Sequence, residues 1–358
     1  MTLPKALIAL SGGVDSSVAA SLTLEAGYAC IGGTMRLFDE SFLPSGICGS
    51  SRDVEDAENV AKKLGFPFYI FDFSGSFREK VIERFVRCYE QGGTPNPCIE
   101  CNRHLKFAQL LEQGELLGCD CIVTGHYARI RRDEVTGRYL LCRAVDKAKD
   151  QSYFLYSLTQ RQLSRVRLPL GELTKEEVRS IAEEKGLLNA RKKDSQDICF
   201  IPDGDHVAFM ERYRGQKYPC GNYLDLQGNV VGQHAGAAGY TIGQRKGLGI
   251  ALGAPVYVCA KDMEANTVTV GPNEALFRRS LRAADWNWFP FPALTEPIRV
   301  LAKVRYRHTE QPATVYPEEN GFARVEFDEP QRAITTGQAV VLYDGDLVIG
   351  GGTITEVL

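Results

Sequence analysis

The chain has 358 residues, of which 44% are hydrophobic, and its formal net charge is −3. A chain of this length and composition can bury enough apolar surface for two or three domains, and its charge excludes a uniformly basic coat for nucleic acid. It contains no run of about 18 apolar residues and no secretion signal at its start, so we expect a cytoplasmic protein without a membrane partner.

Short apolar runs alternate with amphipathic segments over the first 145 residues. The strand-like runs are residues 5–10, 28–35, 66–73, 119–127 and 139–145. This alternation predicts βαβ units and a parallel sheet covered by helices. Two helices have clear boundaries: residues 50–65 begin at serine and end at glycine, and residues 173–186 contain the capping box Thr174 to Glu177 and also end at glycine.

Beyond about residue 205 the sequence changes to glycine-rich turns and short alternating runs. Asn-Gly at 320–321 and Asp-Gly at 344–345 predict hairpin turns between strands. The sequence therefore predicts an α/β fold with a parallel-sheet nucleotide-binding domain, followed by a small central module and a C-terminal β-barrel. We place these three parts at residues 1–205, 206–280 and 281–358.

The stretch "ALIALSGGVDSS" places an apolar strand, a Gly-Ser turn and the start of a helix in direct succession. Two adjacent glycines let backbone amides approach a ligand, and the helix N-terminus favours an anion. Because Asp15 would repel phosphates, a Mg²⁺ ion between them is the simplest explanation of its presence. The residues expected to contact a nucleotide in this loop are Ser11, Gly12, Gly13, Asp15, Ser16 and Ser17.

The motif "SGGVDSS" resembles the pyrophosphate (PP) loop of the ATP-pyrophosphatase superfamily, whose fold is adenine nucleotide alpha hydrolase-like. Five further motifs, "GGTPNPCIECNRHLKF", "VTGHYARI", "DQSYFLYSL", "DSQDICFIPDG" and "GYTIGQRKGLGI", together with "GQAVVLYDGDLVIGGGTI", extend the resemblance to the whole chain. They resemble the bacterial tRNA-specific 2-thiouridylase family. The resemblance implies adenylation of the wobble uridine of Lys, Glu and Gln tRNAs. A persulfide sulfur then comes from a cysteine desulfurase or sulfur-relay protein.

Eleven cysteines without a regular spacing fit a reducing compartment, so each thiol needs its own explanation. Release of a persulfide sulfur requires a second thiolate, and the resemblance implies that Cys199 carries the persulfide and that Cys101 is its partner, ending as a disulfide. Many family members have Asp where this chain has Cys98. Cys98 is therefore either a bystander or, with Cys101 and Cys199, a ligand of an iron–sulfur cluster.

Other candidate residues follow from strand ends, from the resemblance and from basic clusters. Gly125, His126 and Met35 lie where strands end, and ligands of open α/β sheets gather there. Candidate tRNA contacts are Lys149, Gln151, Arg191, Lys192, Arg245, Lys246, Arg305 and Tyr306. Cys48 is a weaker functional candidate. Four cysteines in strand-like runs are expected to pack as small hydrophobic residues, namely Cys30, Cys119, Cys121 and Cys142.

Two other functions remain compatible with parts of the sequence. An adenylating ligase for a small molecule would use the phosphate loop but would leave Cys101, Cys199 and the C-terminal β module without a role. A non-enzymatic redox or metal module that binds RNA would leave the phosphate loop unexplained.

Overall fold

The computed structural model describes residues 3–38, 51–187, 189 and 198–358. Its N-terminal part contains a five-stranded, fully parallel sheet in the order β3-β2-β1-β4-β7. The strands are β1 (Lys5–Ala9), β2 (Ala29–Arg36), β3 (Phe68–Asp72), β4 (Cys121–Val123) and β7 (Val166–Arg167). Because all five run in one direction, their carboxyl ends meet at a single edge of the sheet.

Helices cover both faces of this sheet. One face packs against α1 (Val14–Glu25), α2 (Ser51–Leu64) and α9 (Lys175–Glu184). The other packs against a second set, comprising α3 (Ser74–Phe77), the π-helix η1 (Arg78–Ile82), α4 (Glu83–Glu90), α5 (Pro97–Cys101), the π-helix η2 (Asn102–Gln109) and α6 (Leu110–Leu116). The predicted capping box is present, since Thr174 and Glu177 each bond the other's backbone amide.

The run 139–145 was expected in the parallel sheet, and that prediction is wrong. Its strand β6 (Tyr139–Cys142) pairs antiparallel with β5 (Arg129–Arg132) and extends the sheet of the C-terminal barrel. Asp133 accepts hydrogen bonds from the amides of Val135 and Thr136 and so stabilises the turn between the two strands. A hairpin needs only such a turn, whereas a parallel partner needs a long crossover.

Further helices connect these parts of the chain. They are α7 (Ser152–Leu155), α8 (Gln160–Arg165), the 3₁₀-helix η3 (Pro169–Glu172) and α10 (His206–Arg214). The middle module has a four-stranded sheet in the order β10-β11-β8-β9. Its elements are β8 (Gly221–Leu224), β9 (Val230–His234), the 3₁₀-helix η4 (Ala237–Gly239), β10 (Tyr257–Asp262) and β11 (Thr267–Gly271).

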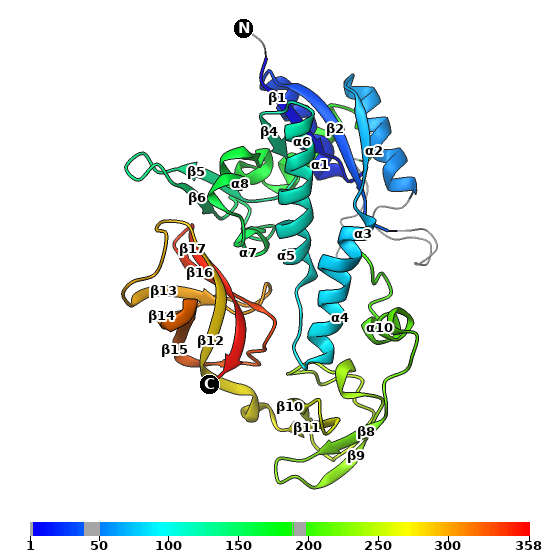
Figure 1. The fold of residues 1–358 in the computed structure, drawn as a ribbon, viewed down its shortest axis with the longest axis vertical. Helices are drawn as coiled ribbons and strands as arrows, with labels where there is room; N and C mark the ends of the chain where they lie inside the picture. The colour runs from blue at the N-terminus through cyan, green and yellow to red at the C-terminus, as the bar shows by residue number, and fades with distance from the viewer. Residues whose placement is uncertain (1–2, 39–50, 188, 190–197) are drawn as a thin grey trace.

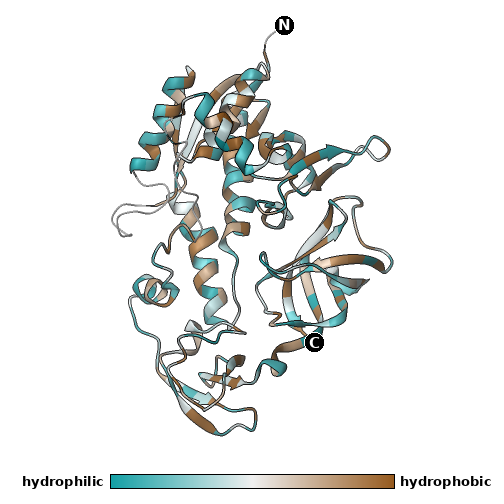
Figure 2. Ribbon diagram, turned by 180° about the vertical axis from the view of Figure 1, so that it is seen from behind, coloured by the Kyte–Doolittle hydropathy of each residue, from teal (hydrophilic) through white to brown (hydrophobic). Residues whose placement is uncertain are grey.

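Six antiparallel strands close into a barrel at the C-terminal end, because β12 pairs with both β15 and β17. The elements are the 3₁₀-helix η5 (Asn273–Leu276), β12 (Phe277–Trp288), β13 (Ile298–Lys303), β14 (Gln311–Pro317), the 3₁₀-helix η6 (Glu319–Gly321), β15 (Ala323–Arg332), β16 (Ala339–Asp344) and β17 (Leu347–Val357). Both predicted hairpins are present, β14 to β15 and β16 to β17. Polar and apolar residues alternate along the barrel strands (Figure 2).

The parallel sheet, the middle module and the barrel surround the helices α4 and α5 (Figure 1). The barrel lies beside α5 and α7, and the β5–β6 hairpin reaches from the parallel-sheet part toward it. Among the described residues, no helix is both long and apolar enough to span a membrane. The fold class predicted from the sequence is confirmed.

Candidate active site

The phosphate loop joins β1 to α1 and is stabilised by its own serines. The hydroxyls of Ser16 and Ser17 donate to the carbonyl of Gly13, at 3.0 and 2.9 Å, and Ser16 also accepts from the Ser11 amide. Gly12 has a φ of +71°, and a Cβ there would lie 2.6 Å from the Asp53 carbonyl. The first amides of α1 have no carbonyl partner within the helix, so the loop keeps the donors that an anion requires.

Asn189 reaches the same loop from a distant part of the chain. Its side-chain amide donates to the Gly12 carbonyl at 3.1 Å and to the Ser17 hydroxyl at 2.7 Å, and it is buried. Sequence reasoning missed this residue, because a single asparagine in a loop resembles any turn residue. Asn189 joins the phosphate loop to the chain shortly after α9.

Asp15 has a different partner from the one expected. The Lys175 ammonium donates to both carboxylate oxygens, at 2.7 and 2.9 Å, and the Tyr127 hydroxyl donates to one of them at 2.8 Å. Lys175 is 8% exposed and begins α9. The negative charge that suggested Mg²⁺ at Asp15 is therefore compensated by a protein cation, and a carboxylate held in this way does not fit a Mg²⁺ ligand. The expectation of a metal bound by Asp15 is not supported by this geometry.

Gly125, His126 and Met35 lie at the same sheet edge as the loop, since β1 pairs in parallel with both β2 and β4. A Cβ on Gly125 would lie 2.8 Å from the Asp15 carbonyl carbon and from the Ser16 nitrogen. Only glycine lets β4 end this close to the start of α1. The strand-end reasoning thus places these candidates together, while their contact with a nucleotide stays a prediction.

Replacing Gly125 with alanine is expected to destabilise the protein by about 1–3 kcal/mol and to weaken ATP binding, because the new methyl group must displace the backbone of the phosphate loop. Chemical denaturation and a nucleotide-binding titration measure the two effects. The matched control is Gly75→Ala in α3, where a Cβ meets nothing within 4 Å. Equal behaviour of the two variants would contradict the expectation.

His126 is held neutral. Its Nδ1 lies 2.8 Å from the Thr124 hydroxyl, and its ring packs on Phe107 with centroids 5.5 Å apart. Burial, aided by the charge of Lys106, lowers the pKa of His126 well below 6.5. A neutral imidazole here can accept or donate a hydrogen bond to a ligand but adds no charge to the site.

The depressed pKa of His126 predicts a pH dependence of stability. Below about pH 6.5 the unfolded chain binds a proton that the folded chain resists, so the free energy of unfolding falls as pH falls. Burial also lowers the pKa values of His206, His234 and His308, which act in the same direction. We expect His126→Asn to lose less stability than the parent between pH 7 and pH 5 in urea titrations. Identical slopes would show that His126 is not the group responsible.

The two thiols of the C-x-x-C stretch lie in different environments on α5. Cys101 is 7% exposed and belongs to the main hydrophobic cluster, whereas Cys98 is exposed. Desolvation by the surrounding protein raises the pKa of the Cys98 thiol, an effect opposed by Lys106. Cys98 is therefore a protonated thiol near neutral pH and lacks the charge of the Asp that the family resemblance implies at this position.

Cys199 packs against the same hydrophobic cluster that contains Cys101. The fold thus places on one cluster two cysteines that lie 98 positions apart in the sequence. No disulfide joins any two of the ten cysteines in the described part of the chain, so the disulfide expected between Cys101 and Cys199 is not present in this structure. Within residues 3–38, 51–187, 189 and 198–358, no three His, Cys, Asp or Glu residues are grouped to hold a metal ion. The cysteines as placed therefore do not fit the iron–sulfur alternative.

The remaining cysteines agree with the expectation that they are structural. Cys30, Cys119, Cys121 and Cys142 are buried, and burial raises their pKa values, to about 11 for Cys30. Cys48 lies outside the described residues. Two candidate tRNA contacts, Arg191 and Lys192, also lie outside them.

Gln151 is tied directly to the nucleotide edge of the sheet. Its side-chain oxygen accepts from the Tyr127 backbone amide at 3.0 Å, and its backbone amide donates to the Tyr127 carbonyl at 2.8 Å. Since the Tyr127 hydroxyl contacts Asp15, a short chain of bonds links Gln151 to the phosphate loop. Lys149, half-buried, lies two residues before it in the turn that precedes α7.

Of the candidate tRNA contacts in the second half of the chain, two are exposed and two already contact other parts of the protein. Arg245 and Lys246 are exposed. Arg305 is not available as expected, because its Nη2 donates to the carbonyls of Ile242 and Ala333 and to the Thr335 hydroxyl. It joins the barrel to the middle module instead. Tyr306 packs on Phe154 with ring centroids 4.3 Å apart, at the boundary between barrel and α7.

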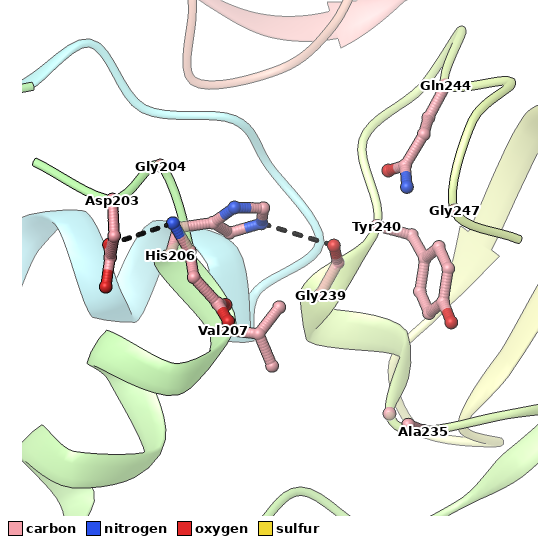
Figure 3. Close-up of a pocket in the computed structure, with 11 residues that line it drawn as sticks. Asp203, Gly204, His206, Val207, Ala235, Gly239, Tyr240, Gln244 and Gly247 are labelled. Carbon is pink, nitrogen blue, oxygen red and sulfur yellow. Dashed lines mark hydrogen bonds between the residues drawn. The ribbon is translucent and has the colours of Figure 1, made fainter. Parts of the chain in front are cut away.

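A separate pocket of about 370 Å³ lies between the start of α10 and residues 235–247 of the middle module (Figure 3). His206 forms one wall and donates from Nε2 to the Gly239 carbonyl at 3.2 Å, while Tyr240 and Gln244 line the other side. None of the predicted catalytic or nucleotide-binding residues lines it. Residues shortly after Cys199 in the chain line this pocket, but the phosphate loop does not.

Three family models match consecutive parts of the chain. They are described as the tRNA methyl transferase HUP domain (residues 4–203), the tRNA methyl transferase PRC-barrel domain (207–272) and the aminomethyltransferase beta-barrel domain (278–354). A solved 4-thiouridine synthetase–RNA complex with bound ATP is 21% identical over 56% of this chain and 45% of its own, with a TM-score of 0.36. A TM-score of this size supports no conclusion about function.

Full-length relatives are much closer. The protein named tRNA-specific 2-thiouridylase MnmA from Moorella thermoacetica is 52% identical, covering 98% of this chain and 99% of its own. Its namesakes from Heliobacterium modesticaldum and Clostridioides difficile are 51% and 48% identical, covering 98% and 99% of this chain and 92% and 99% of their own. With this identity over nearly the whole length, the chain belongs to the family of bacterial tRNA-specific 2-thiouridylases.

Proposed function

We propose that this protein is an ATP-dependent tRNA sulfurtransferase that converts the wobble uridine of Lys, Glu and Gln tRNAs to 2-thiouridine. The observation that carries the proposal is the presence, in one fold, of a phosphate loop at a sheet edge and of two distant cysteines on one hydrophobic cluster. Some matching domain models are described by methyl transfer, but the full-length relatives at 48–52% identity are named for 2-thiolation of tRNA.

The phosphate loop would hold the triphosphate of ATP. Loop amides, the N-terminus of α1 and Gly12 supply an anion site, and Lys175 offsets the charge of Asp15 beside it. A Mg²⁺ ion would arrive with ATP, and nothing in the geometry of Asp15 assigns it that ion. The uridine O2 attacks the α-phosphorus of ATP, pyrophosphate leaves, and the adenylated base carries AMP as a leaving group at C2.

The cysteines would then exchange that AMP for sulfur. The terminal sulfur of a Cys199 persulfide attacks C2, AMP departs, and the base is briefly joined to Cys199 through two sulfurs. The Cys101 thiolate attacks the Cys199 sulfur, so a Cys101–Cys199 disulfide forms and 2-thiouridine leaves. A cellular dithiol must reduce this disulfide, and a cysteine desulfurase or sulfur-relay protein must reload Cys199. Both requirements fit a reducing cytoplasm.

The tRNA would meet the protein between the phosphate loop and the barrel. Phe154 and Tyr306 offer half-buried aromatic faces on which an unstacked base can lie, and Lys149 and Lys303 lie near Tyr306. Gln151 lies three residues before Phe154, whose amide donates to its carbonyl, and Arg245 and Lys246 are exposed. We propose these residues as tRNA contacts and leave out Arg305, whose Nη2 already donates to the carbonyls of Ile242 and Ala333 and to the Thr335 hydroxyl.

Nucleoside mass spectrometry tests the proposal directly. Unmodified tRNA incubated with the protein, ATP, Mg²⁺ and a sulfur donor is expected to contain 2-thiouridine only when ATP is present. The experiment uses inorganic sulfide in one arm and a desulfurase with cysteine in the other, so that a missing donor is not mistaken for a missing activity. No ATP-dependent 2-thiouridine in either arm overturns the proposal.

A further inference from the structure

Cys98 and Cys101 lie at the start of a helical run that continues without a break from α5 through η2 to the end of α6. The N-cap residue of this run, Asn96, forms no side-chain capping bond. The position of its first turns, and with them of the Cys101 thiol, therefore depends on contacts with the rest of the protein on either side of Cys101.

The barrel holds the chain on the N-terminal side of α5. The Thr94 amide donates to the Thr336 carbonyl at 2.8 Å, and the Gln338 side chain donates to the Thr94 and Pro95 carbonyls at 2.9 and 3.3 Å. Gly337, with φ of +83°, makes the approach possible, because a Cβ there would lie 3.2 Å from the Thr94 oxygen and 2.4 Å from the Cys88 sulfur. The loop between β15 and β16 is thus shaped to receive residues 94–95.

The barrel also holds the chain on the C-terminal side of α5. Arg103, two residues after Cys101, forms an ion pair with Asp285 of β12. Asp285 has φ of +54° and lies where the pairing of β12 with β17 is interrupted, so the strand bulges toward the helix. Residues other than glycine rarely adopt this conformation, and bulges commonly redirect a side chain.

A third set of contacts joins the barrel to the helix through α7. The Asn287 side chain, also on β12, donates to the carbonyls of Tyr156 and Leu158 at 2.6 and 2.9 Å, just after α7. From α7, the Phe154 carbonyl accepts from the side chain of Asn102, the neighbour of Cys101, at 3.1 Å. One strand of the barrel therefore contacts the helix after Cys101 both directly and through α7.

We propose that the C-terminal barrel positions the cysteine helix for sulfur transfer, with Asp285 and Gln338 as positioning residues that act through Arg103 and residues 94–95. The expected effect on sulfur transfer rests on the proposed function, whereas the contacts between the barrel and the helix do not. Displacing a reacting group by about 1 Å can lower a rate by roughly a hundredfold. The barrel would thus contribute to the rate of sulfur transfer from outside the catalytic centre.

Asp285→Asn is the sharpest variant, because asparagine tolerates positive φ and keeps the shape of the side chain while removing its charge. The matched control is Asp346→Asn. Asp346 pairs with Arg129 across the same two parts of the protein, is equally exposed, and lies away from α5. A weaker electrostatic attraction for tRNA cannot explain a rate loss in Asp285→Asn. Removing the negative charge of Asp285 leaves the positive charge of Arg103 unbalanced, which would attract tRNA more strongly.

In single-turnover assays with Cys199 preloaded with sulfur, Asp285→Asn and Gln338→Met are each expected to slow formation of 2-thiouridine roughly ten- to hundredfold. The KM for ATP should stay unchanged, and Asp346→Asn should behave as the parent. Arg103→Lys, which keeps the charge, should retain more activity than Arg103→Met. Equal rates for Asp285→Asn and Asp346→Asn overturn the inference, as does a rate loss that follows thermal stability across all variants.

A second readout does not depend on sulfurtransferase activity. The rate of Cys101 alkylation by iodoacetamide, located by fragment mass spectrometry to separate Cys101 from Cys98, should change in Asp285→Asn and Gln338→Met but not in Asp346→Asn. If the parent forms no 2-thiouridine, the proposed function fails while alkylation still decides the positioning. If all four proteins are alkylated at the same rate, the positioning inference fails whatever the activity is.

Discussion

Cys101→Ser and Cys199→Ser are each expected to reduce formation of 2-thiouridine by roughly a thousandfold or more, because each thiolate forms a bond that a serine hydroxyl cannot replace. Adenylation should survive in both variants, since the phosphate loop lies at the edge of the sheet and neither cysteine contributes to it. Tritiated or mass-labelled nucleosides measure thiolation, and tRNA-dependent exchange of pyrophosphate into ATP measures adenylation.

Cys98→Ser is the control for this pair. It changes a thiol in the same first turns of the helix, and Cys98 is exposed, whereas Cys101 lies in the hydrophobic cluster. If Cys98 is a bystander, the variant should keep most of the activity of the parent. Anaerobic purification with iron and sulfide assays makes the comparison decisive. A Cys98→Ser protein as inactive as Cys101→Ser, lacking iron and sulfide that the parent preparation contains, would restore the cluster alternative despite the present arrangement of the thiols.

The sequence predicted the fold well because hydrophobic periodicity reports burial directly. The runs that became β1, β2 and β4 carry the buried core of the sheet, β3 forms its more exposed edge, and helical segments between all four runs imply parallel pairing. The run containing β6 was misplaced for a physical reason, since an apolar strand does not encode which sheet it will join. Its partner β5 is largely polar, and the turn that pairs them is set by the short-range bonds of Asp133.

The site was predicted where chemistry and topology coincide. Gly12, Gly125 and His126 could be placed together because parallel strands end at one edge. Lys175 and Asn189 were missed because they contact the loop from 160 and 177 positions away in the sequence. These contacts depend on how α9 and the turn after it fold back onto the loop. Arg305 shows the converse limit, because a basic cluster in the sequence does not reveal which of its charges are already bonded inside the protein.

Asp285 and Gln338 illustrate a further kind of information that the sequence does not carry. Each looks like an ordinary polar residue of a barrel strand or turn. They matter only because the barrel packs beside α5 (Figure 1). There they contact the chain on both sides of Cys101. Such contacts between separately folding parts follow from packing and not from local pattern.

Lys175→Met is expected to weaken ATP binding roughly tenfold or more and to lower stability by about 1–3 kcal/mol. The Asp15 carboxylate would keep the Tyr127 hydroxyl but lose the ammonium that offsets its charge beside the incoming phosphates. The stability effect is moderated because the Asp15 side chain is 30% exposed. Lys185→Met is the control, since Lys185 forms a surface pair with Glu25 at the other end of α9, and exposed pairs contribute little to stability.

The double variant Asp15→Asn with Lys175→Met decides between the two explanations of Asp15. If the carboxylate is there to fix Tyr127 and Lys175 around the loop, removing both charges together should restore much of the stability and ATP affinity lost by Lys175→Met alone, because no uncompensated charge remains. If Asp15 instead binds Mg²⁺ during turnover, the double variant should stay impaired, and its defect should shrink as Mg²⁺ is raised. Titration of ATP at several Mg²⁺ concentrations with all three variants separates the two outcomes, and the geometry of Lys175 leads us to expect the first.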